Sequence, residues 1–259
     1  MRDDDDLTTD QQTTDVQADS LPGPGEAGEI VGFGGLGAKL NWLRASVLGA
    51  NDGVVSGAGI TIGVAVANPA NLAEIMLAGV AGLLAGASAM AMGEYVSVSS
   101  QRDTEEALIA RERHDLSSHP REEFEELVEV YRRQGLSEPT ARAVVKELTA
   151  HNPLGAHLRA EYGVHQNELT TPWHAAFASA VSFTAGFLLP LTAMFLCSRE
   201  LRIPVTVVVG LVGLLLTGTI SSVISGSPKT RPILRNLIGG SIAMLLTWGI
   251  GHLFGLGAG

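Results

Sequence analysis

Charged residues are scarce in this sequence of 259 residues, where Asp, Glu, Lys and Arg together make up 17%. A soluble domain usually carries roughly 25%. Cysteine is nearly absent too, and the single Cys197 cannot form a disulfide within the chain, so we expect it to pack as a small apolar residue in a membrane span. A basic surface is also lacking, because the formal net charge is −10. We therefore expect no nucleic-acid partner.

The first 37 residues predict a disordered, acidic amino-terminal tail. They combine a run of Asp with Thr, Gln, Pro and Gly, and cannot bury enough apolar surface to offset the entropy lost on ordering. They also lack the basic start and apolar centre of a cleavable secretory signal. The tail (1–37) is thus the first of four predicted regions.

Long apolar stretches follow the tail and predict an all-α integral membrane protein. A bilayer core of roughly 30 Å needs about 20 apolar residues in a helix. The stretches of that length are 43–67, 72–98, 174–197, 203–225 and 234–256. We expect about five transmembrane helices, two within 38–99 and three within 172–259, with a polar helical domain (100–171) inserted between the second and third.

The placement of Lys and Arg predicts which side of the membrane the insert faces. The insert carries nine of the 17 basic residues, and the turn between the first two spans carries none. Basic residues collect on the cytoplasmic side, so we expect the amino terminus and the insert there. The short tail, without an organelle-directing amphipathic segment, favours a bacterial inner membrane over a vacuole.

Helix signals divide the insert into four segments. The second span runs on into QRDTEEALIARERHDL, which contains neither Gly nor Pro. Pro120 suits a first helical position, and Ser137 is placed to cap a third helix that Pro153 ends. A short fourth helix ends at Gly163.

Acidic side chains in the insert recur at helical spacing. The residues that share a helix face are Glu105, Glu112 and Asp115 on the continuing second span, Glu122, Glu126 and Glu129 on the next helix, and His157 and Glu161 on the fourth. Carboxylates from facing helices can coordinate divalent cations, and imidazole shifts the preference towards transition metals. The alternative is a solvated acidic face that complements the helix dipoles.

Three side chains within the first two spans are candidate metal ligands. Asp52 follows Asn51 in LGANDGVVSG, and a carboxylate inside a membrane predicts a functional site unless it only caps a broken helix or bonds a neighbouring span. Met90 and Glu94 are four residues apart near the cytoplasmic end of the second span. A thioether and a carboxylate on one face suit a cation such as ferrous iron.

These motifs resemble the vacuolar iron transporter family over residues 40–257. The most specific elements are LGANDGVVSG, LLAGASAMAMGEYVSVSSQRD, HNPLGAHLRAEYG and PWHAAFASAVSFTAGFLLPL. The resemblance implies a homodimer of five-helix protomers with a cytoplasmic metal-binding domain. It also implies export of Fe²⁺ or Mn²⁺ as transported substrate in exchange for protons, without a cofactor.

The resemblance also assigns roles to individual residues. By motif, the metal ligands are Asp52, Met90, Glu94, Glu112, Asp115 and Glu161. Glu123 and Glu126 are the preferred second carboxylate pair, and Glu122 and Glu125 stay open as the alternative. His157 and Leu158 stand where some relatives have Met and Glu, and Asp115 replaces a Glu.

Two other functions compete with metal transport. In a membrane-anchored metal sensor or storage module, the spans would merely hold the acidic domain at the bilayer, and such an anchor has no use for Asp52. An intramembrane hydrolase would need a paired nucleophile and base, and His174 and His252 lie near span ends without a partner motif. We therefore expect a transporter and not an enzyme.

Overall fold

The computed structural model describes residues 36–164, 171–226 and 228–257. The predicted tail lies outside them, apart from its last two residues, which belong to the first helix. The described residues form α-helices and no strand. In chain order the helices are α1 (Leu36–Ala67), α2 (Leu72–Ser118), α3 (Pro120–Arg133), α4 (Glu138–His151), α5 (Pro153–Glu161), α6 (Pro172–Leu196), α7 (Arg202–Ser225) and α8 (Thr230–Gly257).

Among the described helices, α1, α2, α6, α7 and α8 are long and apolar enough to cross a membrane. This confirms the five predicted spans. The largest difference at a helix start is at α1, which begins at Leu36, seven residues before the predicted start. The largest difference at an end is at α2, which continues to Ser118, 20 residues beyond the predicted end of the span at 98. The chain is a multi-pass membrane protein.

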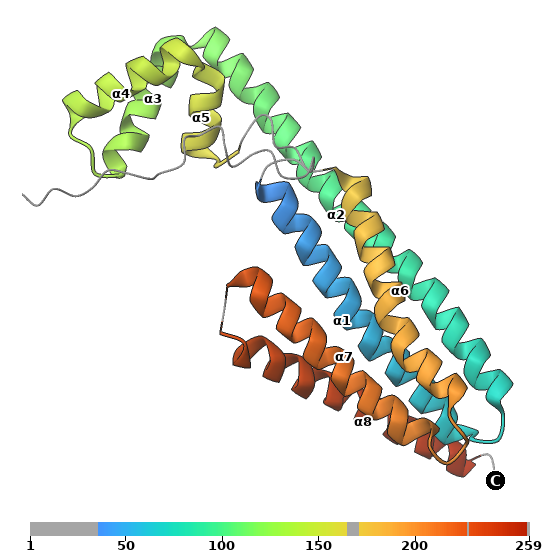
Figure 1. The fold of residues 1–259 in the computed structure, drawn as a ribbon. Coiled ribbons are helices and arrows are strands. Elements are labelled where there is room, and N and C mark those ends of the chain that lie inside the picture. Colours follow the sequence, from blue (N-terminus) through green and yellow to red (C-terminus); the bar gives the residue numbers. More distant parts are fainter. Residues whose placement is uncertain (1–35, 165–170, 227, 258–259) are drawn as a thin grey trace, which may run out of the picture. The chain divides into compact units, whose positions relative to one another are not determined.

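Helix α2 is a single helix of 47 residues that extends well beyond one membrane crossing. It begins where the Asn71 side chain accepts a hydrogen bond from the backbone N–H of Glu74, and it ends before Pro120, which opens α3. The predicted run-on into 101–116 is therefore confirmed. Figure 1 shows that the first part of α2 lies along α6, whereas its last part meets the short helices α3 and α5.

The closest packing in the membrane part lies between α1 and α6. A Cβ at Gly53 would overlap the backbone oxygen of Phe183, and a Cβ at Gly49 would lie 2.6 Å from the backbone oxygen of Ser179. From the other side, a Cβ at Gly186 would overlap the backbone oxygen of Ala50. Small residues let membrane helices approach until their backbones touch. The glycines at 49, 53 and 186 thus fix how α1 lies against α6.

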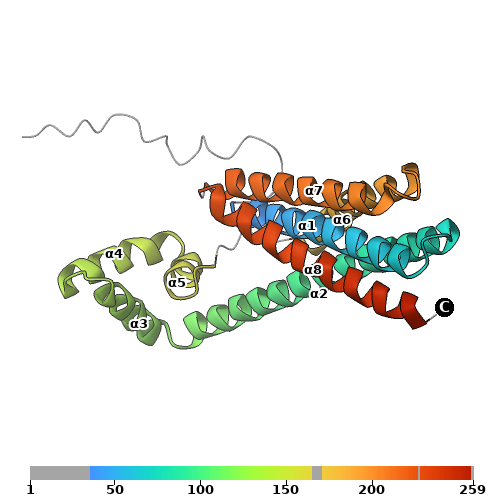
Figure 2. The ribbon, with the colours of Figure 1, turned by 90° about the horizontal axis from the view of Figure 1, so that it is seen from below.

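A second face of α1 packs against α8, as Figure 2 shows. Gly63 lies close to Thr247, and a Cβ at Gly251 would overlap the backbone oxygen of Gly63. The buried core of this part takes side chains from all five long helices: Val54, Ala58, Ile62, Ala65, Ile75, Met194, Leu214 and Met244. Helix α1 is therefore central, with neighbours on different faces.

We predict that Gly53→Ala destabilises the protein, because the new methyl group meets backbone atoms of α6 that cannot rotate away. Overpacking of this kind costs about 1–3 kcal/mol. Gly239→Ala is the matched control, since no atom lies within 4 Å of a Cβ there and Ala is the better helix former. Thermal unfolding in detergent should show a lower midpoint for Gly53→Ala alone; equal midpoints would contradict the close contact.

Candidate metal-binding sites

The short helices α3, α4 and α5 form a small core of their own. Leu127 and Val128 of α3 pack with Ala141 and Val145 of α4 and with Ala156 of α5. Figure 1 shows α5 lying beside α2, and the same helix contacts α3 and α4. This packing fixes which side of α5 faces α2.

Helix α5 begins and ends at well-defined local signals. The Asn152 side chain accepts a hydrogen bond from the backbone N–H of Gly155 at 2.9 Å, and Pro153 occupies the first turn. Beyond the other end, Gly163 adopts a left-handed conformation with φ +65°, which glycine tolerates best. Between these signals, His157 and Glu161 are one helical turn apart and point the same way.

Four side chains from three helices converge where α5 meets α2 and α3. They are Glu112 of α2, Glu123 of α3, and His157 and Glu161 of α5, and each offers a ligand atom within 4.8 Å of the others. The Nδ1 atom of His157 lies 2.9 Å from Glu161 Oε1, 3.0 Å from Glu112 Oε1 and 3.6 Å from Glu123 Oε2. We call these four residues the carboxylate–histidine cluster.

The carboxylate–histidine cluster has more acceptors than its one donor can satisfy. Nδ1 of His157 hydrogen-bonds to Glu161, whereas the buried Oε1 of Glu112 has no hydrogen-bond partner despite its short distance to the same nitrogen. Ligands about 2.0–2.2 Å from a transition metal lie within about 4.4 Å of one another. A small adjustment would therefore let the cluster hold one divalent cation, and that cation would supply the missing positive charge.

Burial and crowded negative charge make these carboxyl groups weak acids. Burial raises the pKa of Glu112 to about 7, and the charge of Glu161 adds to the effect. Burial and the charge of Glu126 likewise raise the pKa of Glu161 to about 7. The pKa of Glu123 is raised in the same way, by burial and then by Glu126. A proton would therefore compete with a metal ion for the cluster near neutral pH.

The other predicted ligands of the insert lie outside the cluster. Glu105 accepts a hydrogen bond from the Gln101 amide at 3.0 Å, and Asp115 lies 3.5 Å from the Arg111 guanidinium. Glu126 and Asp115 are close enough for their charges to raise the pKa of Glu123. Glu126 and Asp115 thus surround the cluster with negative charge.

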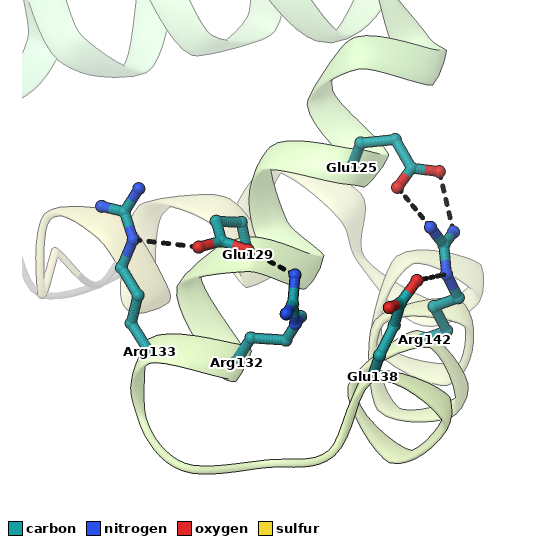
Figure 3. A network of polar contacts seen from close by, with 6 residues as sticks. All are labelled: Glu125, Glu129, Arg132, Arg133, Glu138 and Arg142. Carbon is teal, nitrogen blue, oxygen red and sulfur yellow. Dashed lines mark hydrogen bonds and ion pairs between the residues drawn. The ribbon is translucent and has the colours of Figure 1, made fainter.

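The alternative pair Glu122 and Glu125 is exposed. Figure 3 shows that Glu125 instead receives two hydrogen bonds from Arg142 of α4, at 2.8 and 2.7 Å. Glu129, also in the picture, pairs with Arg132 and Arg133. Of the two alternatives, the structure brings Glu123 to the cluster and leaves Glu122 and Glu125 outside it.

The predicted residues of the membrane part lie on α1 and α2. Asp52 is half-buried in α1, next to the tight contact at Gly53. Met90 packs against the buried residues Phe183, Phe187 and Leu191 of α6. Glu94 is largely buried, and its Oε1 lies 3.5 Å from Nη2 of Arg44 without a hydrogen-bond partner.

Sequence reasoning missed a polar chain that ties α1 to α7 and α8. The Thr217 hydroxyl of α7 donates a hydrogen bond to Asn51 Oδ1 at 3.4 Å, and the Asn236 amide of α8 donates to the Thr217 hydroxyl at 3.5 Å. Amides inside a membrane need such partners. The occurrence of Asn in two predicted spans, at 51 and 236, was the signal that could have found this chain. It holds the residue next to Asp52 in place.

Comparison with known proteins gives consistent matches. The model of the "VIT family" matches residues 43–252. The "Vacuolar iron transporter" of Acanthamoeba castellanii is 36% identical over 213 residues, which cover 82% of this chain and 78% of the relative. "Vacuolar iron transporter homolog 5" of Oryza sativa subsp. japonica is 36% identical over 85% of this chain and 83% of its own length. "Vacuolar iron transporter homolog 3" of Arabidopsis thaliana is 34% identical over 84% and 85%.

We predict that divalent-metal binding to the cluster weakens as the pH falls from 8 to 6. A metal must displace the protons of Glu112 and Glu161, whose pKa values are about 7, and each displacement costs about tenfold in affinity over that range. Titration of the full-length protein with Mn²⁺ at several pH values measures the effect. Affinity independent of pH would show that these carboxyl groups do not bind the metal.

Metal affinity should rise with pH, whereas the stability of the metal-free protein should fall as the pH rises. The folded-state pKa values of about 7 lie above 4.5, the ordinary pKa of a glutamate, so the folded state holds protons that the unfolded state has released. Stability should therefore fall as the pH rises from about 4.5 to 7. Thermal unfolding of the metal-free protein in this window measures it, and a rise over the same window would contradict the shifted pKa values.

Glu112→Gln with Glu161→Gln should abolish Mn²⁺ binding to the cluster while the helices stay folded. The substitution keeps the size of each side chain and removes the negative charge that a cation needs. Glu122→Gln with Glu125→Gln is the matched control, because it removes two negative charges from exposed carboxylates outside the cluster. Calorimetry that finds equal losses for both variants would mean that the insert attracts metal only through its net charge.

Proposed function

The chain belongs to the VIT family, and from that membership and the two sets of ligands we propose that it moves Fe²⁺, and also Mn²⁺, out of the cytoplasm in exchange for protons. Membership in the family confirms the resemblance found in the sequence. The protein carries iron or a related divalent metal across a membrane, and its relatives are named as vacuolar iron transporters or their homologues. The direction, the coupling to protons and the choice of Mn²⁺ belong to the proposal.

The observation that supports this proposal most directly is the continuity of α2. The same helix carries Met90 and Glu94 in its membrane part and Glu112 of the carboxylate–histidine cluster beyond it. At 1.5 Å per residue, Glu94 and Glu112 lie about 27 Å apart along the helix. We propose that the cluster collects metal in the cytoplasm and that Glu94, Met90 and Asp52 carry it through the membrane.

Three further features complete the proposal. The insert 100–171 faces the cytoplasm, because it carries nine basic residues. The working unit is a homodimer in a bacterial inner membrane, and the exposed apolar side chains of α2, among them Leu77, Leu84 and Val96, face lipid or the second protomer. Protons replace the metal at Asp52, because a carboxylate inside a membrane needs a cation or a proton.

The second candidate is a membrane-anchored metal sensor or storage module. The carboxylate–histidine cluster alone would serve that function as well. Asp52 favours transport, because an inert anchor has no need of a carboxylate at the tight α1–α6 contact. Membership in the VIT family favours transport too.

We predict that Asp52→Asn abolishes proton-coupled metal flux. Asn keeps the size and the hydrogen bonding of the side chain, so the fold should survive, but it can neither bind metal as an anion nor accept a proton. Flux of Fe²⁺ or Mn²⁺ in proteoliposomes with an imposed pH gradient measures the loss.

Glu74→Gln is the matched control, since it removes a carboxylate from the first turn of α2. There Glu74 accepts a hydrogen bond from the Asn68 side-chain amide. Its flux should equal that of the parent. Parent-like, pH-dependent flux from well-folded Asp52→Asn would leave Asp52 with a structural role. Absence of flux from the parent, with metal binding intact, would favour the sensor or storage function.

A further inference from the structure

A positively charged side chain lies beside Glu94, one of the proposed transport ligands. Nη2 of Arg44, on α1, is 3.5 Å from Oε1 of Glu94, on α2. The Arg44 side chain is 60% exposed and the Glu94 side chain only 10%. The guanidinium therefore covers the buried carboxylate from the solvent side.

Both residues lie at the same depth, at the end of the spans away from the turn between α1 and α2. Arg44 is 23 residues before the end of α1, and Glu94 is 22 residues after the start of α2. Each is therefore about 33–35 Å from the turn along its helix. Asp52 lies eight residues further along α1, about 12 Å deeper. The pair thus lies at the mouth of the path that the proposed function assigns to the metal.

The chemistry of the pair follows from the needs of a buried carboxylate. Oε1 of Glu94 has no hydrogen-bond partner, and among the ion pairs described in the structure the guanidinium of Arg44 is its partner. A buried anion without a cation is costly. A metal ion that binds Glu94 from the solvent side would meet Arg44 in the position it needs, and two cations repel each other at such short distances.

We propose that Arg44 is a resident counter-ion of Glu94 that an incoming metal must displace, and that this competition keeps weakly binding monovalent cations out of the site. The inference rests on the proposed function, because it takes Glu94 as a transport ligand. Exchanging a guanidinium for Na⁺ replaces one positive charge by another and gains little. Exchanging it for Fe²⁺ or Mn²⁺ doubles the charge beside the carboxylate. Arg44 thus lowers the affinity for every cation by a similar factor. A weakly bound Na⁺ then cannot occupy the site, whereas a divalent ion, which binds a carboxylate more strongly, still can.

The test measures Mn²⁺ flux by the full-length protein in proteoliposomes, with Na⁺ exchanged for a bulky organic cation at constant ionic strength. For the parent, we expect a KM that does not depend on Na⁺. For Arg44→Gln and Arg44→Met, we expect a KM several-fold lower without Na⁺ and a several-fold rise when Na⁺ is added. Arg44→Lys keeps the charge and should restore the behaviour of the parent.

Two controls separate this role from others. Arg102→Gln removes a positive charge from an exposed pair with Glu106 on α2, about 12 Å beyond Glu94 along the helix, and should leave KM and its Na⁺ dependence unchanged. In a Glu94→Gln background, replacing Arg44 should have no further effect on KM. Using both Gln and Met at position 44 keeps the test valid if one variant folds poorly, and Arg44→Lys gives a folded reference.

The outcomes are distinct. A higher KM in the uncharged variants would show that Arg44 helps the metal to bind, and an unchanged KM without Na⁺ competition would show that it does not act at the site; either result overturns the inference. The same change in Arg102→Gln would overturn it as well, since any nearby charge would then suffice. Parent-like KM and flux in Glu94→Gln would instead remove Glu94 from the proposed path, while absence of flux from the parent would refute transport itself.

Discussion

The close contact between α1 and α6 is the constraint on which the membrane part depends. Gly49 and Gly53 on α1 and Gly186 on α6 bring the two backbones together, and no larger side chain fits at these positions without moving backbone atoms. Another face of α1 is held against α8 by Gly63 and Gly251. Because α1 cannot shift against either neighbour, the carboxylate of Asp52 has a fixed depth. A site that must discriminate between ions needs ligands held in this way.

A second constraint, the cost of burying a carboxylate, shapes both ligand regions. Glu94 is covered by the guanidinium of Arg44, and Glu112 lies against the imidazole of His157. In neither pair does the Glu Oε1 have a hydrogen-bond partner. Buried anions that are only partly compensated bind cations well, because the incoming charge removes a penalty that the fold already carries. A buried carboxylate beside a basic side chain thus occurs once in the membrane part and once in the insert.

The sequence predicted the helices better than the partners of their side chains. Spans and caps depend on local patterns, so the run-on of α2 and the start of α3 at Pro120 could be read directly. The choice between Glu122 and Glu123 could not be predicted from local patterns, because it depends on how the turn at His119 rotates α3 about its axis. The engagement of Glu125 by Arg142 of α4 depends likewise on tertiary packing. The pairing of Arg44 with Glu94 could have been predicted. A short turn joins two antiparallel helices here, so residues that are equally far from the turn along each helix lie at the same depth.

The spacing along α2 limits how the two ligand regions can cooperate. Glu112 lies 18 residues beyond Glu94 on one unbroken helix, which places them about 27 Å apart along its axis. On the proposed route, a metal ion cannot bridge that distance while bound to both, so it would have to leave the carboxylate–histidine cluster before it reaches the membrane. Very tight binding in the cluster would then slow transport, and a pKa of about 7 for Glu112 and Glu161 lets protons weaken the binding near neutral pH. The raised pKa values thus suit a cluster that collects metal and also releases it.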